Sequence, residues 1–235
     1  MAVAAQHEGA AAPPAWVQRG ATAGFFAVAL LFVAYLLRYY ATGAGGPTLL
    51  AVAMVPVAYI IATLDDLRRG LLYPRLGPAG STAVAAVFIG LATASGLYLY
   101  SEFEAIRFSR LGLWTTGDLV AGAVLILLLL EYSRRKYLPL FILNVLLILY
   151  VVYGNVIPGL FGHPGMSWRR VVTSMSLETT TGIFERLPQL ALTLIGSFLL
   201  VLAVLRGFGA VDSILRAASR VAARSPHLLP QAAVV

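Results

Sequence analysis

The chain has 235 residues, of which 60% are hydrophobic and only 11% are charged, and its mean hydropathy is +0.85. Soluble domains average about 45–50% apolar and about 25% charged residues, so the composition excludes an ordinary soluble domain and predicts an integral membrane protein. The absence of cysteine excludes disulfides, thiolate nucleophiles and cysteine-ligated metal centres. The net charge of +7 has to be judged against topology first, because cytoplasmic loops of membrane proteins collect Lys and Arg.

Hydropathy along the chain predicts an all-α, polytopic bundle of transmembrane helices. The first twenty residues are small, polar and proline-containing, and we expect a flexible cytoplasmic tail. The six predicted spans are residues 21–37, 48–64, 83–100, 119–130, 138–156 and 188–205. A secretory signal peptide is the alternative for the first span, but its apolar run exceeds the usual length of about 7–15 residues, which favours an uncleaved helix.

Proline, glycine and alanine have predictable places in these spans. Pro56 interrupts the second span, where neighbouring helices can accommodate it. Pro139 stands at the start of the fifth span, where a missing amide donor costs little. Asn155 is expected to cap or break that helix together with its neighbours Gly154 and Pro158. Small residues that permit close helix contact in lipid occur along the third span: Gly90, Ala92, Ala94 and Gly96.

Three further segments mix charged and apolar residues and are predicted to lie on the membrane surface. Residues 101–116 alternate Glu102, Glu104, Arg107 and Arg110 with apolar positions. Residues 167–187 are amphipathic and place Trp168 at the interface. In residues 211–224, one helical face carries Val211, Ile214, Leu215, Ala218 and Val221, and the other carries Arg216, Arg220 and Arg224.

The basic residues predict the orientation of the bundle. Six spans put both termini on one side, and that side receives Arg19, Arg68, Arg69, Arg75, Arg134, Arg135, Lys136, Arg206, Arg216, Arg220 and Arg224. The other side receives six arginines, most of them beside glutamates. The positive-inside rule therefore predicts cytoplasmic N- and C-termini. No basic patch interleaved with aromatic residues points to nucleic acid, so no nucleic-acid partner is predicted.

Catalytic chemistry is poorly represented, and an enzyme is not predicted. The three histidines, His7, His163 and His227, have no metal-ligand partner at helical spacing. The sequence also lacks a Walker-type phosphate loop, a Gly-x-Ser-x-Gly elbow and a His-Glu-x-x-His pair.

Polar groups near membrane depth are more informative, because an ionisable group in hydrocarbon costs at least about 2.5–3.5 kcal/mol. Asp118 and Glu131 stand at the two ends of the fourth span, where water or an arginine can reach them. Glu131 has Arg134 and Arg135 within one helical turn, which favours a local ion pair over a role in transport.

Other candidate contacts lie in the second half of the chain. Asn144 is six residues into its span and is predicted to hydrogen-bond to a neighbouring helix, with a substrate or ion contact as the alternative. Glu178 and the run Thr179-Thr180-Thr181 form either a solvated interfacial turn or part of a functional loop. The candidate interhelix or partner contacts are Asp118, Glu131, Arg134, Arg135, Asn144, Glu178, Thr181 and Arg186.

Residues 95–235 contain, in this order, Asp118-Leu119, Glu131, Arg134-Arg135, Pro158-Gly159-Leu160 and a Thr-Thr-x-Gly-Ile-Phe run that ends at Phe184. The order and spacing of these motifs resemble the fused permease subunit of TRAP transporters, the tripartite ATP-independent periplasmic transporters. The branch is the four-plus-twelve-helix type that works with TAXI-type solute-binding proteins. In that family a helix begins with Asp-Leu and ends in an acidic residue followed by a basic pair. The matching residues are Asp118-Leu119, Glu131 and Arg134-Arg135, then Pro158-Gly159-Leu160, Thr179-Thr180-Thr181-Gly182-Ile183-Phe184 and Gly209-Ala210-Val211-Asp212. Two residues depart from the pattern: Thr181, where the family usually has an acidic residue, and Glu185, where it usually has glycine.

The resemblance implies three parts: a tail at 1–20, a four-helix scaffold at 21–137, and at 138–235 a connecting helix, an amphipathic arm and the first helix of the transport part. It implies a component of a transporter in a bacterial or archaeal cytoplasmic membrane, with a large transport subunit or domain, a periplasmic TAXI-type binding protein and the lipid bilayer as partners. Sodium is implied for the complete transporter, and no cofactor for this chain. The Ser/Gly-rich hairpins that bind sodium and substrate in the family have no counterpart in the sequence, so no complete substrate or sodium site is expected here.

Two alternatives to a transporter component stay open. A stand-alone structural or assembly membrane protein would suit a six-span bundle equally well. A membrane enzyme or complete small transporter would need convergent polar residues inside the bundle, where only Asn144 lies deep enough.

Overall fold

The computed structural model describes residues 13–179, 181–210, 213–217 and 219. These residues form helices, turns and loops, with no strand among them. Six helices are long and apolar enough to cross a membrane: Ala15–Thr42, Gly46–Arg68, Pro74–Ser101, Thr116–Lys136, Leu138–Val156 and Gly182–Gly207. Each predicted span lies within one of them, which confirms the prediction of an all-α, polytopic membrane protein.

The chain divides into two compact units, Met1–Gln189 and Leu190–Val235. The sequence placed a boundary after residue 137 instead, but the connecting helix and the amphipathic arm belong to the first unit. The second unit contains a π-helical turn, η7 (Ala191–Ile195), and α8 (Gly196–Gly207), neither of which has a buried residue. Of the predicted basic surface helix, residues 213–217 are helical, whereas Val211, Ala218, Arg220, Val221 and Arg224 lie outside the described residues.

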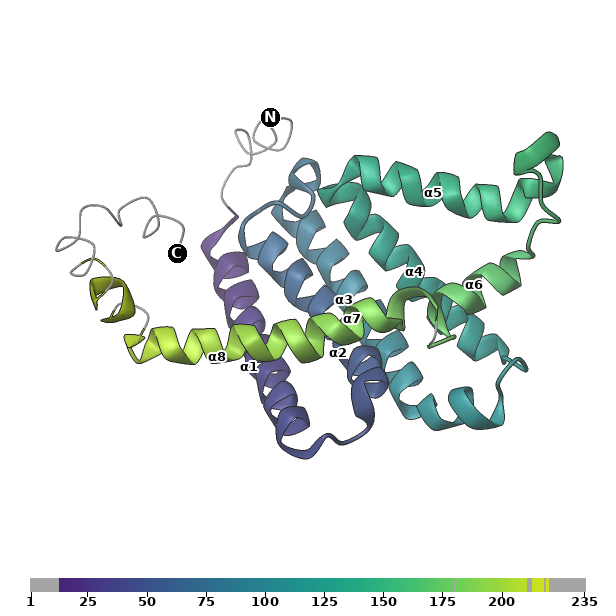
Figure 1. The fold of residues 1–235 in the computed structure, drawn as a ribbon. Coiled ribbons are helices and arrows are strands. Elements are labelled where there is room, and N and C mark those ends of the chain that lie inside the picture. Colours follow the sequence, from purple (N-terminus) through teal and green to yellow (C-terminus); the bar gives the residue numbers. More distant parts are fainter. Residues whose placement is uncertain (1–12, 180, 211–212, 218, 220–235) are drawn as a thin grey trace. The chain divides into compact units, whose positions relative to one another are not determined.

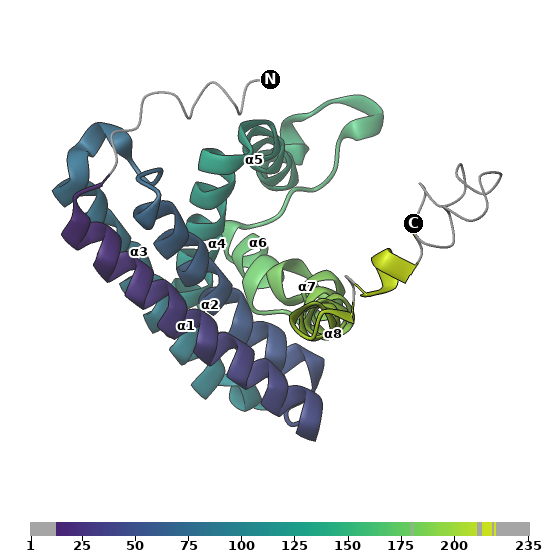
Figure 2. The ribbon, with the colours of Figure 1, turned by 90° about the vertical axis from the view of Figure 1, so that its left-hand side faces the viewer.

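Four helices form the bundle of the first unit: α1 (Ala15–Thr42), α2 (Gly46–Arg68), α3 (Gly77–Ser101) and α4 (Thr116–Lys136). They lie side by side, with α2 packed between α1 and α3 and with α4 on the other side of α3 (Figures 1 and 2). Helix α1 begins six residues before the end of the predicted tail, and Val17 in its first turn is buried. Residues 1–12 of that tail lie outside the described residues.

Glycine makes the tight turn between α1 and α2. Gly43 has a φ of 63° and donates its backbone N–H to the Tyr39 carbonyl, which ends α1. Gly45 and Gly46 also have positive φ, a region that glycine enters without steric cost. Two long apolar helices can therefore reverse direction within three residues.

Helices α2 and α3 are in close contact. A Cβ on Gly96 would lie 2.8 Å from the Cβ of Pro56, and Ala92 is fully buried on the same face. Helix α2 continues through Pro56, as predicted. The prediction of small contact residues is thus confirmed for Ala92 and Gly96, but Gly90 and Ala94 face outward.

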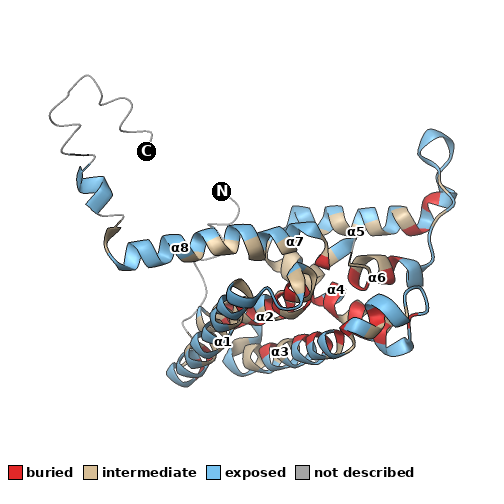
Figure 3. Cartoon of the chain, turned by 60° about the horizontal axis from the view of Figure 1, so that its bottom comes forward, coloured by how far each residue is buried: buried red, intermediate tan, exposed pale blue. Residues whose placement is uncertain are grey.

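A second group of helices extends from the end of α4. Helix α5 (Leu138–Tyr153) begins after a single non-helical residue and runs away from the bundle (Figures 1 and 3). It ends at Tyr153, and the 3₁₀ turn η4 (Gly154–Val156) follows, which confirms the predicted break. Val152 is its only buried residue.

The chain then returns to the bundle through the arm, residues 168–184, which comprises α6 (Trp168–Ser176) and the 3₁₀ turn η6 (Gly182–Phe184). Helix α6 packs on α4, and η6 packs on α2. Buried residues gather where α2, α3, α4 and α6 face one another, whereas α5 is mostly exposed (Figure 3). The predicted amphipathic segment is therefore part of the core of the first unit.

Replacing Gly96 by leucine tests the α2–α3 contact. The new side chain must displace the rigid ring of Pro56, and overpacking of this kind costs about 1–3 kcal/mol. We expect Gly96→Leu to lower the thermal unfolding temperature in detergent. The matched control is Gly90→Leu on the same helix, because a Cβ there meets nothing within 4 Å. Equal stability of the two variants would contradict the proposed contact.

Candidate functional site: charged clusters at the two ends of the bundle

The end of the bundle where α2 and α4 terminate holds a buried carboxylate. Asp66 is 2% exposed and lies on the buried face of α2. Its Oδ2 accepts from Arg135 Nη1 at 2.8 Å, and its Oδ1 accepts from Lys136 Nζ at 2.5 Å. Arg135 is itself largely buried, so both charges are removed from water together. These bonds join the last turn of α2 to the last turn of α4.

Glu131 lies beside this pair and confirms the predicted local ion pair. It accepts from Arg134 Nε and Nη2, each at 2.7 Å, and Arg135 Nε lies 3.8 Å away. The Tyr73 hydroxyl donates a short hydrogen bond to the same carboxylate. Burial and the adjacent carboxylate raise the pKa of the Tyr73 phenol, so the hydroxyl stays a donor at neutral pH. We call the group Asp66, Tyr73, Glu131, Arg134, Arg135 and Lys136 the Asp66 cluster.

Asp118 occupies the opposite end of the bundle, at the first turn of α4. Its Oδ2 accepts from the Thr115 backbone N–H at 2.8 Å, and the Thr115 hydroxyl accepts from the Asp118 N–H, which together form a capping box. Tyr98 of α3 donates to its Oδ1 at 3.1 Å, and Arg110 lies 3.5 Å away. The side chain is fully buried, so of the two expected partners, water or an arginine, the arginine is the one that reaches it.

The arm is fixed to α4 through a glycine. A Cβ on Gly122 would lie 2.1 Å from the Ser176 hydroxyl and 3.1 Å from the Ser176 Cβ of α6, so a larger residue would have to displace this serine. At the start of the arm, Arg169 Nη2 donates to the Trp114 carbonyl at 2.8 Å. At its end, Phe184 is 1% exposed.

Glu178 and Thr181 meet within the arm. Glu178 forms a short ion pair with Arg170, and its Oε2 lies 3.4 Å from the hydroxyls of Ser174 and Thr181. Thr181 also donates to the Ser174 carbonyl at 2.8 Å. Glu178 is therefore a partnered side chain that orders the turn. Thr180 lies outside the described residues.

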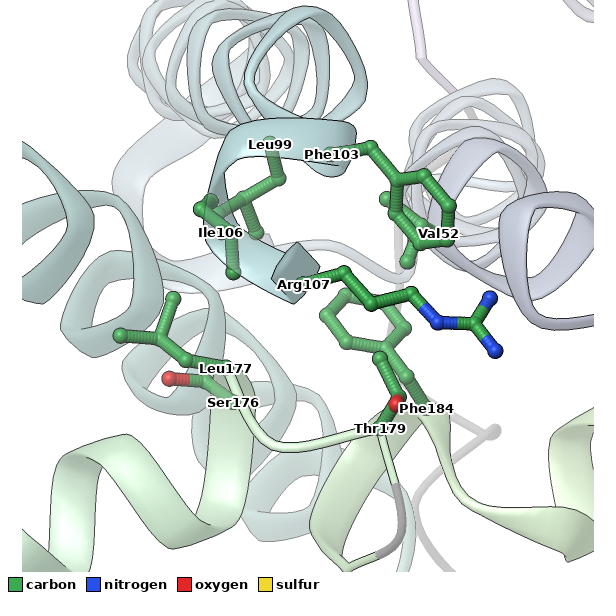
Figure 4. A pocket seen from close by; sticks show the side chains of 9 residues that line it. All are labelled: Val52, Leu99, Phe103, Ile106, Arg107, Ser176, Leu177, Thr179 and Phe184. Atoms are coloured by element: carbon green, nitrogen blue, oxygen red, sulfur yellow. The ribbon is translucent and has the colours of Figure 1, made fainter. Parts of the chain in front are cut away.

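A narrow apolar hollow of about 20 Å³, room for about one water molecule, lies between the bundle and the arm. Its wall includes Val52, Leu99, Phe103, Leu177 and Phe184. Figure 4 shows the rings of Phe103 and Phe184 above and below the Arg107 side chain. A wider pocket of about 480 Å³ shares Arg107 with this hollow and also reaches Trp114 and Arg170.

Two predicted contact residues do not join these clusters. Asn144 donates its side-chain N–H to the Leu140 carbonyl at 2.9 Å, so this bond stays within α5 and does not reach the neighbouring helix that the sequence suggested. The physical reason is that α5 diverges from the bundle and leaves the i−4 carbonyl as the nearest acceptor. Arg186 is exposed at the start of α7 (Arg186–Leu190) and forms none of the ion pairs found among the described residues.

Sequence reasoning missed Asp66. Asp65 and Asp66 both follow the second predicted span directly, and that position alone does not separate them. A signal was present, because Asp66 is seven residues after Tyr59 and three after Thr63, both on the buried face of α2. Asp65 instead pairs with Arg68 and Arg69 on its own helix.

Comparison with models of known protein families, with curated proteins and with solved structures finds no match. Among the described residues, no group of three or more His, Asp or Glu side chains could hold a metal ion.

Neutralising Asp66 tests the Asp66 cluster. Asp66→Asn removes the nearest counter-charge of the buried Arg135, which keeps only Glu131 at 3.8 Å, and breaking a buried pair costs about 3–5 kcal/mol. The matched control is Asp65→Asn, which removes only partly exposed pairs worth about 0.2–1 kcal/mol each. The free energy of unfolding, measured by SDS titration, should fall far more for Asp66→Asn. Equal losses would show that Asp66 has no special role.

Proposed function

We propose that this chain is a membrane component of a TRAP-type secondary transporter of the TAXI-associated branch. In this proposal the first unit is a scaffold for the sodium-driven uptake of organic acids that a periplasmic binding protein delivers. The chain lies in a cytoplasmic membrane with the Asp66 cluster on the cytoplasmic side. The basic residues at that end of the bundle, Arg68, Arg69, Arg134, Arg135 and Lys136, support this orientation.

The observation that carries the proposal is that residues matching the TRAP-like motifs order the start of α4 and the turn of the arm, and that Phe184 of the last motif joins the arm to the bundle. Asp118 is fully buried in the capping box of α4. Gly182 has a φ of 75°, and a Cβ there would lie 2.1 Å from the Met175 carbonyl oxygen. Phe184, the last residue of the Thr-Thr-x-Gly-Ile-Phe motif, is buried and lines the same hollow as Val52 of α2. The local packing and backbone geometry therefore favour Asp at 118, Gly at 182 and Phe at 184.

The charge distribution also supports a scaffold. The carboxylates of the two bundle ends and of the arm, Asp66, Asp118, Glu131 and Glu178, each have a cationic partner in the first unit. Paired side chains of this kind stabilise helix ends and are poorly suited to bind and release a substrate. The resemblance implies that a mobile transport part, on the same or another polypeptide, carries the substrate across while the scaffold stays in place.

Reconstitution tests this proposal. The tagged chain is captured in mild detergent from its own host, and complexes are placed in liposomes with an inward sodium gradient and labelled organic acids. We expect the chain to co-purify with a TRAP-type transport part, and that complex to take up organic acid only with sodium and a TAXI-type binding protein. The chain alone should show no uptake.

Two results would contradict the proposal. Sodium-dependent uptake by the chain alone would show a complete transporter, and a stable chain that recruits no transport part would favour a structural membrane protein without transport activity. The cysteine-free sequence allows the orientation to be tested in the same membranes. A cysteine placed at Gly112 should react with an impermeant maleimide from outside, and one placed at Gly70 should not.

A further inference from the structure

The wider pocket at the Asp118 end of the bundle has both a charged and an apolar side. It lies between the π-helical turn η3 (Ala105–Ser109), the loop before α4 and the turn after α6, and has a volume of about 480 Å³. Its charged side contains Arg107, Arg170 and Glu178. Its apolar side contains Ile106, Leu111, Trp114 and Leu177.

The net charge of this pocket is positive, because its one carboxylate is already partnered. Glu178 is engaged by Arg170 through one oxygen and lies near two hydroxyls through the other. Arg107 forms none of the ion pairs found among the described residues, although the exposed Glu104 is on the preceding turn. The nearby Glu102 is paired with Arg110 at 2.5 Å. The guanidinium of Arg107 is thus available to bind an anion.

Aromatic rings hold Arg107 in position. Its guanidinium carbon lies 5.7 Å from the ring centre of Phe103 and 5.3 Å from that of Phe108, both within the range of a cation–π contact. Such contacts leave the N–H edge of the guanidinium available to phosphate, which it binds through two donors. Phe103 is buried and thereby limits the movement of the side chain.

The surroundings of the pocket fit the headgroup region of a membrane. It lies between the end of α3 and the start of α4, where two candidate spans reach the membrane surface. Three large apolar side chains project beside it: Phe108 is 68% exposed, Leu111 is 68% exposed and Leu113 is 78% exposed. Apolar side chains next to a cation are typical of segments that lie in the lipid interface.

We propose that this pocket binds the phosphate of a lipid with a singly anionic headgroup, with Arg107 as the main phosphate ligand and Leu111 and Trp114 against the apolar part. Arg170 uses its Nη1 to bind Glu178, and its remaining guanidinium N–H donors can also bind the phosphate. The inference concerns lipid recognition and does not depend on the proposed transport function.

Isothermal titration of the purified full chain in detergent tests the site. The probes are short-chain phosphatidylglycerol, phosphatidylcholine with the same acyl chains, octyl phosphate and inorganic phosphate. We expect phosphatidylglycerol to bind at least about tenfold more tightly than phosphatidylcholine, and octyl phosphate more tightly than inorganic phosphate. A preference for octyl phosphate over phosphatidylglycerol would overturn the assignment to a lipid, and tight binding of inorganic phosphate alone would overturn the role of the apolar side.

Variants separate the two sides of the pocket. Arg107→Gln should weaken phosphatidylglycerol binding about tenfold, whereas Arg75→Gln, which removes an exposed arginine outside the pocket, should leave it unchanged. Leu111→Gln should weaken the binding of phosphatidylglycerol and leave the binding of inorganic phosphate unchanged. Thermal unfolding of each variant checks its fold, and both Arg107 and Leu111 are exposed, so stability should hold. Equal phosphatidylglycerol binding by the original chain and by Arg107→Gln would overturn the proposal.

Discussion

The ion pair between Asp66 and Arg135, with Lys136 as the second cation, is the constraint on which the bundle depends. A buried carboxylate in an apolar chain is tolerated only with a charged partner, and both of its oxygens are occupied. Because the partners lie on α4, the pair fixes the end of α4 against the end of α2. The apolar helices themselves have little preference for one register in lipid, since lipid tails are as apolar as their side chains.

The position of α4 determines where the arm can bind. With one end held by Asp66 and the other by the capping box of Asp118, α4 presents Gly122 to Ser176 of α6. The arm then reaches α2 through Phe184 and encloses the hollow beside Arg107. Charge pairing at the two ends, small-residue contact along the helices and the arm thus form one connected structure. Helix α5 stays largely exposed outside this connected structure.

Local patterns predicted most of the fold. Continuous apolar runs located all six spans, and the Thr-x-x-Asp spacing at Thr115 and Asp118 is a helix-start signal that any sequence reading can use. The Glu131–Arg134 pair was predictable because both residues lie within one turn. The ion pairs of Asp66 were not predictable, because its partners are 69 and 70 residues away. Sequence spacing does not show which helix ends meet. The prediction that Asn144 bonds to a neighbouring helix was wrong for a related reason. The sequence does not show that α5 diverges from the bundle.

A double-mutant cycle on Asp66 and Arg135 tests this account most directly. Asp66→Asn, Arg135→Gln and the double variant are compared with the original chain by their free energies of unfolding in an SDS titration. If the pair fixes α4 to α2, each single variant loses stability and the double variant loses clearly less than the sum of the two, because the second substitution removes a side chain whose main partner is already gone. Losses that add within about 0.5 kcal/mol would show that the two side chains do not act together, and would contradict the account.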